Sequence, residues 1–276
     1  MQTISRRSVL AMGAAALLAK ADPLGMPIGC QTYPVRDALG KDFEGTLRQL
    51  AGIGYKRIEM CSPPGYANAG YGPLTKIAPP EMRKTIEAAG LRCESSHFNF
   101  RELKENLDDR IGWAKELGLR QMVCSTFGLP RTATMADWGS AAQTLNGIGE
   151  RVQKAGMQLG FHNHDFEFQK IDGELIYDAL MQRLDPKLVK MQFQVSVISL
   201  GYEAAAFMTK YPGRFLSLHL QDWSPEEKKQ VAVGKGVVSW KNLFAAAKTG
   251  GIHNYFVELN MDMLGPSYSF LHELKA

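Results

Sequence analysis

A polar cluster at the end of an apolar run decides how this chain folds. The stretch reads Met157-Gln-Leu-Gly-Phe-His-Asn-His-Asp-Phe-Glu-Phe168. Successive side chains of a β-strand point to opposite faces, so His162 and His164 share one face. Burying two imidazoles and a carboxylate at a strand end is costly unless something pairs with them. A metal ion or a polyhydroxylated substrate would do so; a hydrogen-bonded strand end in a loop is the alternative.

Strand-like apolar runs alternate with helical patterns on both sides of this stretch. We expect strands at residues 28–33, 57–61, 92–96, 121–125, 158–163, 189–195, 215–220 and 254–259. We expect helices at residues 43–53, 79–89, 101–117, 136–155, 174–183, 203–210, 240–248 and 268–274. Asp137 is the expected N-cap residue of the fourth helix. Alternating strands and helices of this number predict an α/β fold, a (β/α)₈ TIM barrel in a single domain.

An open, doubly wound parallel sheet is the alternative architecture for the same alternation. Such a sheet usually carries a glycine fingerprint directly after its first strand. Here the first strand is followed by Gln31-Thr-Tyr-Pro-Val-Arg36, which contains no glycine. The barrel is therefore the favoured prediction.

The first 21 residues predict an export signal rather than a part of the fold. Ser5-Arg-Arg-Ser-Val-Leu10 precedes a short apolar run, and Ala19-Lys-Ala21 matches a small-x-small cleavage site. The pattern is typical of a twin-arginine signal peptide; an uncleaved anchor or an unstructured N-terminus is the alternative. We expect a signal peptide at residues 1–21 and a barrel domain at residues 22–276. The expected location is the periplasm or another exported site, without stable membrane insertion.

The charge of the chain argues against a nucleic-acid partner. The formal net charge is +4, to which Arg6, Arg7 and Lys20 contribute three positive charges. Without residues 1–21 the charge falls to +1, which is too small for the basic groove that phosphate binding needs. We expect a small-molecule partner, and the oligomeric state stays open, a homo-oligomer included.

The four cysteines recur about every 31 residues, each in or beside an apolar run. They are Cys30, Cys61, Cys93 and Cys124. We expect four buried free thiols at equivalent points of successive strands, because twin-arginine substrates fold in a reducing compartment before export. Disulfide pairing of thiols on neighbouring strands is the alternative for an exported protein.

Polar side chains gather at the ends of the expected strands, where a TIM barrel carries its active site. They are Gln31, Tyr33, Glu59, Glu94, Ser95, Ser96, His97, His162, His164, Glu167, Gln192, Gln194, His219, Gln221, Asp222, Glu258 and Asn260. Imidazoles and carboxylates at one barrel mouth form a mixed nitrogen and oxygen ligand set. Such a set suits Mn²⁺, Zn²⁺, Fe²⁺ or Co²⁺.

The chain resembles the sugar phosphate isomerase/epimerase family of xylose-isomerase-like TIM barrels. The motifs are Gly160-Phe-His-Asn-His-Asp-Phe-Glu-Phe168, Ser217-Leu-His-Leu-Gln-Asp222, Val233-Gly-Lys-Gly-Val-Val-Ser-Trp240 and Tyr255-Phe-Val-Glu-Leu-Asn260. The resemblance spans most of residues 22–276. Its motifs are specific for the superfamily and say little about the substrate.

The resemblance implies one divalent ion at the barrel mouth, of the Mn, Co, Zn, Fe or Mg group. The family's ligands are a Glu, an Asp, a His and a Glu from the fifth to the eighth strand. His219 and Glu258 match the last two positions, and the fifth-strand position is open between His162 and Glu167. On the sixth strand, Gln194 stands where the family has Asp. With one anionic ligand lost, the ion is expected to bind more loosely, to have moved or to be absent.

The resemblance also implies a sugar isomerase or epimerase that removes a proton next to a carbonyl to give an ene-diolate. Two carboxylates are the candidate proton-transfer residues, Glu167 and Glu258. The candidate substrate-binding residues are His97, His164, Asp222 and Trp223. A lyase acting on a keto-sugar or keto-glycoside is the first alternative, because it begins with the same proton abstraction. A non-catalytic sugar-binding barrel, in which Gln194 marks a lost metal site, is the alternative from another class.

Overall fold

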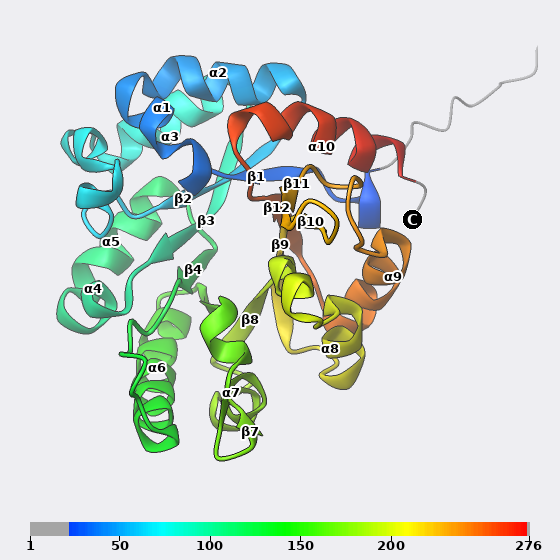
Figure 1. The fold of residues 1–276 in the computed structure, drawn as a ribbon. Coiled ribbons are helices and arrows are strands. Elements are labelled where there is room, and N and C mark those ends of the chain that lie inside the picture. The colour runs from blue at the N-terminus through cyan, green and yellow to red at the C-terminus, as the bar shows by residue number, and fades with distance from the viewer. Residues whose placement is uncertain (1–21, 275–276) are drawn as a thin grey trace, which may run out of the picture.

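The structure, a computed structural model, describes residues 22–274, so the predicted signal peptide lies outside the described residues. Parallel strands form a closed barrel (Figure 1): β1 Gly29–Gln31, β2 Arg57–Cys61, β3 Arg92–Phe98, β4 Gln121–Cys124, β5 Gln158–His162, β8 Val189–Gln194, β9 Phe215–Leu220 and β12 Asn254–Val257. Around the ring their order is β1-β12-β9-β8-β5-β4-β3-β2. The predicted (β/α)₈ barrel is confirmed.

Helices surround this barrel and cover its outer face. They are α1 Arg36–Lys41, α2 Phe43–Ile53, α3 Pro79–Ala88, α4 Phe100–Glu105, α5 Leu107–Leu117, α6 Met135–Lys154, α7 Ile176–Arg183, α8 Ala204–Lys210, α9 Trp240–Gly250 and α10 Met261–Glu273. Among residues 22–274, none of the helices combines the length and the apolar character that crossing a bilayer requires.

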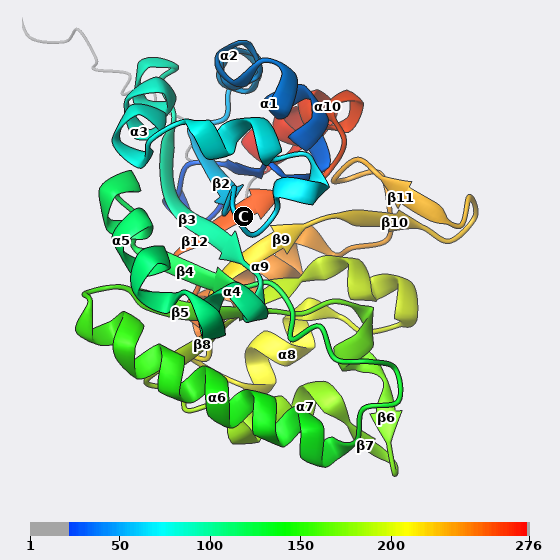
Figure 2. The ribbon, with the colours of Figure 1, turned by 90° about the vertical axis from the view of Figure 1, so that its left-hand side faces the viewer.

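Two small hairpins were absent from the predicted elements. One pairs β6 Lys170–Ile171 with β7 Glu174–Leu175, and the other pairs β10 Asp222–Ser224 with β11 Lys229–Val231. Strands of two or three residues are too short to show a periodic pattern. Figure 2 shows the β10–β11 hairpin extending from the side of the barrel toward which the arrowheads of β3 and β9 point. The hairpin therefore belongs to the end of the barrel where the site is expected.

Two helix boundaries differ from the predicted ones. The single helix predicted at residues 101–117 is two helices, α4 and α5, separated at Asn106, whose backbone angles (φ −134°, ψ 34°) are not helical. The N-cap of α6 is Thr134, and Asp137 is its partner three residues later. The Thr134 hydroxyl accepts a hydrogen bond from the Asp137 amide, and the Asp137 carboxylate accepts one from the Thr134 amide. The prediction of Asp137 as N-cap was wrong, because this carboxylate closes a capping box instead.

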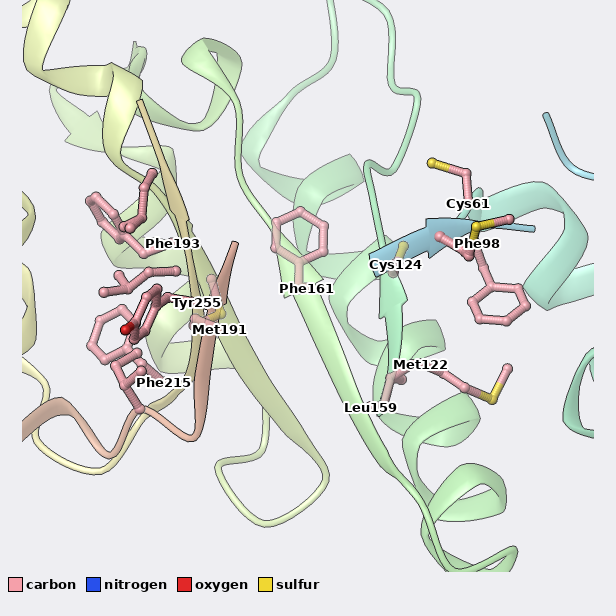
Figure 3. Close-up of a cluster of buried hydrophobic side chains, with 14 of the residues drawn as sticks. Cys61, Phe98, Met122, Cys124, Leu159, Phe161, Met191, Phe193, Phe215 and Tyr255 are labelled. Carbon is pink, nitrogen blue, oxygen red and sulfur yellow. The ribbon is translucent and has the colours of Figure 1, made fainter. Parts of the chain in front are cut away.

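The core lies between the strands and the surrounding helices. Phe161 on β5 and Phe193 on β8 are completely buried there, and Figure 3 shows them with the outward-facing side chains of neighbouring strands. Burial of a phenylalanine side chain stabilises a fold by about 1.5–3 kcal/mol. The next residue on each strand points the other way, so His162 and Gln194 face the inside of the barrel. Each strand thus supplies apolar groups to the core and polar groups to the interior.

All four cysteines are buried and free, which confirms the predicted thiols. One lies on each of β1 to β4, but not at equivalent points. Cys61 and Cys124 end their strands, whereas Cys93 is the second residue of β3. Burial raises the pKa of Cys93 to about 12, so this group stays a thiol at neutral pH.

Gly29 makes room for the aromatic ring of Phe256 inside the barrel. The ring lies on the side of the polar cluster from which the strands begin. Gly29 and Phe256 are paired across β1 and β12, two residues before Gln31 and Glu258 respectively. A Cβ atom at Gly29 would lie 2.4 Å from Phe256 Cδ1 and 2.8 Å from the backbone oxygen of Tyr255. Only glycine at this position leaves room for the Phe256 ring.

We expect Gly29→Ala to lower the free energy of unfolding by about 1–3 kcal/mol, because the added methyl group overpacks the barrel interior. The matched control is Gly52→Ala in α2, where a Cβ atom meets nothing within 4 Å and the better helix propensity of alanine raises stability by up to about 1 kcal/mol. Urea unfolding of both variants measures the difference. Equal stability of Gly29→Ala and wild type would contradict the packing argument.

Candidate functional site

Three histidines from different strands meet inside the barrel near the strand ends. His97 lies on β3, His162 on β5 and His219 on β9. Their ring centroids are 4.9 Å apart for His97 and His162, 5.1 Å for His97 and His219, and 4.5 Å for His162 and His219. All three rings are buried. The parallel barrel thus brings together three of the imidazoles singled out in the sequence.

The fully buried carboxylate of Glu59, on β2, joins this cluster to four further strands. Its Oε1 accepts hydrogen bonds from Ser95 Oγ at 2.5 Å and from Gln192 Nε2 at 2.9 Å. Its Oε2 accepts from Gln31 Nε2 at 2.7 Å and from His219 Nε2 at 2.5 Å. The sequence marked Glu59 as a polar strand residue but gave it no role, because its partner His219 lies 160 positions later.

Glu59 and His219 form a buried ion pair. Burial by itself would raise the pKa of Glu59, but attraction to His97 and His219, with hydrogen bonds from His219 and Ser95, lowers it to about 2. Burial would likewise lower the pKa of His219, but the Glu258 and Glu59 carboxylates raise it to about 9. At neutral pH His219 is therefore an imidazolium between two carboxylates. Burial lowers the pKa of His97, although the charge of Glu59 opposes this shift.

Glu258, directly after β12, is the second carboxylate of this arrangement. Its Oε2 accepts hydrogen bonds from Gln194 Nε2, from Gln221 Nε2 at 2.9 Å and from His219 Nδ1 at 3.2 Å. Burial would raise its pKa, but the charge and hydrogen bond of His219 lower it. Within the described part of the chain, no hydrogen bond reaches its Oε1. Glu258 is therefore an ionised carboxylate with one free oxygen.

The ligand set implied by the family is only partly suited to a cation. Glu258 Oε2 is already surrounded by three N–H donors, one from the amide of Gln194, so a cation does not fit at this oxygen. The imidazoles offer a better place. The ligand atoms of His97, His162 and His219 all lie within 4.8 Å of one another. Because His219 already donates both ring N–H groups to Glu59 and Glu258, the ligands open to a divalent ion are the imidazoles of His97 and His162 and the free Oε1 of Glu258.

A cavity of about 1020 Å³ opens over this cluster. His97, His162, Gln194 and Glu258 are among the residues that line it. Its more exposed lining residues include Tyr33, Tyr66, Asp165, Phe166, Leu200, Tyr202 and Arg131. The sequence did not single out Arg131, whose guanidinium lies 5.8 Å from the centre of the Phe166 ring, because the loop after β4 follows no periodic pattern. Volume and lining are those of a small-molecule site.

Glu167 lies outside this cluster, in a short 3₁₀ helix, η5 Asp165–Phe168. Its Oε2 accepts a hydrogen bond from the backbone N–H of His164 at 2.8 Å, and the residue does not line the cavity. Burial raises the pKa of Glu167 to about 7. His164 itself does line the cavity, and its buried Nδ1 has no hydrogen-bond partner among residues 22–274. The structure thus brings His164 to the site and gives Glu167 a capping position.

Asp222 and Trp223 also lie outside the cavity lining. The Asp222 carboxylate accepts hydrogen bonds from the backbone amides of Trp223, Gly234 and Val238 and from the indole of Trp240, at 2.9 to 3.1 Å. These bonds order the loop between β9 and α9. The geometry shows Asp222 organising a loop, and the sugar contacts of Asp222 and Trp223 stay predictions.

Comparison with known proteins identifies the family. Residues 47–264 match the family described as the xylose isomerase-like TIM barrel. The chain therefore belongs to the xylose isomerase-like TIM barrel family, which confirms the resemblance seen in the motifs.

Its relatives are enzymes of sugar and inosose chemistry. An inosose dehydratase from Clostridium perfringens is 29% identical, over 70% of this chain and 68% of its own length. One from Clostridium beijerinckii is 23% identical, over 71% and 69%. The solved structure of a sugar phosphate isomerase/epimerase from Parabacteroides distasonis has a TM-score of 0.76 and 26% identity, and covers 96% of this chain and 98% of that one. These similarities indicate an enzyme and leave its reaction open.

We expect the stability of the protein to fall as the pH rises through about 9, the pKa of folded His219. Because the pKa is raised, protonation of His219 stabilises the fold fully below pH 6.5, which is the ordinary pKa of histidine. This contribution falls as the pH rises and is lost above about pH 9. The loss is about 3 kcal/mol, at about 1.4 kcal/mol per pKa unit. Urea unfolding between about pH 6 and pH 10, with a chelator present, measures it.

His219→Gln removes this titration, so its stability should lack the fall that wild type shows. The control is His253→Gln, at an exposed position outside the cluster, which should keep it. A His219→Gln profile parallel to wild type would show that another group causes the loss.

Proposed function

We propose that this chain is a carbohydrate lyase. It removes a proton next to the ketone of a keto-sugar or keto-cyclitol and expels the neighbouring hydroxyl as water. The observation that carries the proposal is Glu258, an ionised carboxylate at the cavity with Oε1 free. The other carboxylate that lines the cavity, Asp165, is exposed. The inosose dehydratases among the relatives support the same class of reaction.

One carboxylate is sufficient for this elimination. Glu258 Oε1 takes the proton from the carbon next to the ketone, and the electrons of that C–H bond form a carbon–carbon double bond. The C–O bond of the hydroxyl on the next carbon breaks as the double bond forms. Glu258 then returns its proton to the departing oxygen, which leaves as water. Since Glu258 acts as both base and acid, the proton and the hydroxyl leave from the same face.

Neighbouring groups hold the substrate and favour the charge that develops on it. Gln194 Oε1 and His164 Nδ1 are buried polar atoms on cavity-lining residues without hydrogen-bond partners in the described chain, and they suit the binding of sugar hydroxyls. His97 and His162 line the same cavity, where they would stabilise negative charge that develops on the carbonyl oxygen in the transition state. A divalent ion at the histidines, when bound, would polarise that carbonyl.

Isomerisation or epimerisation is the second candidate, favoured by the solved relative from Parabacteroides distasonis. It requires return of the proton to carbon rather than loss of water. The two reactions differ in deuterium oxide. An isomerase or epimerase yields a product of the substrate's composition that carries solvent deuterium, whereas a lyase yields an unsaturated ketone lighter by one water. A binding protein without catalysis would give neither product.

We expect Glu258→Gln to lower kcat by about 10²–10⁴-fold, the usual contribution of a positioned acid–base group. The substrates to screen are keto-cyclitols and keto-sugars, with product formation followed by mass spectrometry and NMR. Glu226→Gln is the matched control at an exposed position of the hairpin loop, and it should keep wild-type turnover. Dehydration by Glu258→Gln at the wild-type rate would remove this residue from the mechanism.

An apolar rim favours a keto-glycoside as the larger form of the substrate. Phe166 is 44% exposed and Leu200 is 48% exposed, and both line the cavity. An aromatic aglycone would cover these side chains while the sugar ring reaches Glu258.

We expect Phe166→Ala to raise KM for an aryl keto-glycoside by about 10–100-fold, since burial of one aromatic ring contributes about 1.5–3 kcal/mol. KM for the free keto-sugar should stay unchanged. Val237→Ala removes a comparably exposed side chain (51%) outside this cavity and serves as the control. Equal effects of Phe166→Ala on both substrates would contradict a role for the rim in aglycone binding.

A further inference from the structure

We propose that Gln230, on the β10–β11 hairpin, is a positioning residue for the Glu258 carboxylate and acts through the side-chain amide of Gln221. This inference rests on the proposed function, because it concerns the same carboxylate. Its test includes a measurement of hydrogen bonding that needs no turnover, so each proposal can fail without the other.

Two hydrogen bonds in series join the hairpin to this carboxylate. Gln230 Nε2 donates to Gln221 Oε1, and Gln221 Nε2 donates to Glu258 Oε2 at 2.9 Å. Gln221 is 8% exposed and lines the cavity, whereas Gln230 is not among the lining residues. Gln230 is therefore separated from Glu258 and from a bound substrate by one side chain, and it acts on them only through Gln221.

The ionised carboxylate sets the direction of these two hydrogen bonds. A carboxylate without a proton only accepts hydrogen bonds, so Gln221 must turn its NH₂ group toward Glu258. Its carbonyl oxygen then faces away and takes a donor from Gln230. The two ends of a glutamine amide are almost alike in shape. Hydrogen bonds rather than packing therefore decide which end of Gln221 faces Glu258.

The register of the hairpin brings Gln230 to this position. Gln230 pairs with Trp223 across β10 and β11, and Gln221 precedes Trp223 by two residues. Gln230 and Gln221 are thus diagonal neighbours, a spacing that long side chains can bridge. The Asp222 carboxylate fixes the start of β10 by accepting from the Trp223 amide and the Trp240 indole. The donor at position 230 is therefore held in place by the fold of the hairpin (Figure 2).

This orientation matters because Oε2 of Glu258 is restrained by the protein while Oε1 is left for the substrate. Gln194 and His219, from the barrel strands β8 and β9, donate to Oε2, and Gln221 is the third donor. If the Gln221 amide turned over, its carbonyl oxygen would face Oε2, and the two negative partial charges would repel. A displacement of a reacting group by about 1 Å can lower a rate about 100-fold.

We expect Gln230→Glu to lower kcat by about 10–100-fold with little change in KM, because the residue does not line the cavity. The new carboxylate has no hydrogen to donate and attracts the NH₂ group of Gln221 away from Glu258. Gln230→Lys keeps a donor at this position, so its kcat should stay within about threefold of wild type. Turnover of keto-cyclitols and keto-sugars, followed by mass spectrometry, measures both variants.

Lys229→Gln is the matched control. It lowers the charge of the hairpin by one unit, as Gln230→Glu does, at an exposed position on the opposite face of β11, and it should keep wild-type kcat. An equal loss in Gln230→Lys and Gln230→Glu would overturn the proposal, because a donor at position 230 would then have no importance. Wild-type kcat in Gln230→Glu would overturn it as well.

NMR of the side-chain amides tests the two hydrogen bonds without turnover. The NH₂ signal of Gln221 is the one that disappears in Gln221→Met. Glu258→Gln and Gln230→Glu should both shift this signal, since the first changes the acceptor at Nε2 and the second removes the donor at Oε1, whereas Lys229→Gln should leave it in place. A signal that ignores Gln230→Glu would overturn the proposal. A signal that responds to both, in a protein that dehydrates no keto-cyclitol or keto-sugar, would keep the positioning role and remove the lyase.

Discussion

The polar interior of the barrel depends on the contact between Glu59 and His219. Two charged groups removed from water each lose several kcal/mol of solvation, and an ion pair survives burial only when its remaining hydrogen-bonding atoms are also satisfied. Donors on three other strands, Gln31, Ser95 and Gln192, meet this condition for the carboxylate. Loss of one charge would leave the other uncompensated, at a cost of about 3–5 kcal/mol. Hydrogen bonds and charge attraction therefore connect five of the eight barrel strands through this one ion pair.

The same contact links the buried network to the cavity. His219 lies between Glu59 on its inner side and Glu258 on its outer side, so its positive charge keeps both carboxylates ionised. Gln194 completes the arrangement by donating an N–H group to Glu258. An ionised aspartate at that position would have no hydrogen to donate. The replacement of the family's Asp by Gln194 thus fits the proposed role of Glu258 as a base.

The sequence predicted the architecture well and the site less completely. The alternation of apolar strands with helices locates the barrel strands in the sequence, and the alternation of side chains along a strand indicates which residues face inward. The convergence of His97, His162 and His219 therefore followed once a barrel was assumed. The role of Glu59 did not follow, because which partner a buried carboxylate takes depends on distances across the ring. The position of Glu167 did not follow from the sequence either. It is close to His162 in the chain, but three residues after His164 it closes the cap of a 3₁₀ helix.

The hydrogen bonds of Asp222 have a consequence for how a ligand is received. Four donors fix the loop that follows β9, directly after the cavity-lining Gln221, when the protein folds. The entropy of ordering this loop has therefore already been lost before a molecule arrives. Association then carries no further ordering cost on this side, which favours affinity through preorganisation. Adjustment to ligands of different size then falls to the cavity-lining loops that carry the exposed side chains of Arg131 and Phe166.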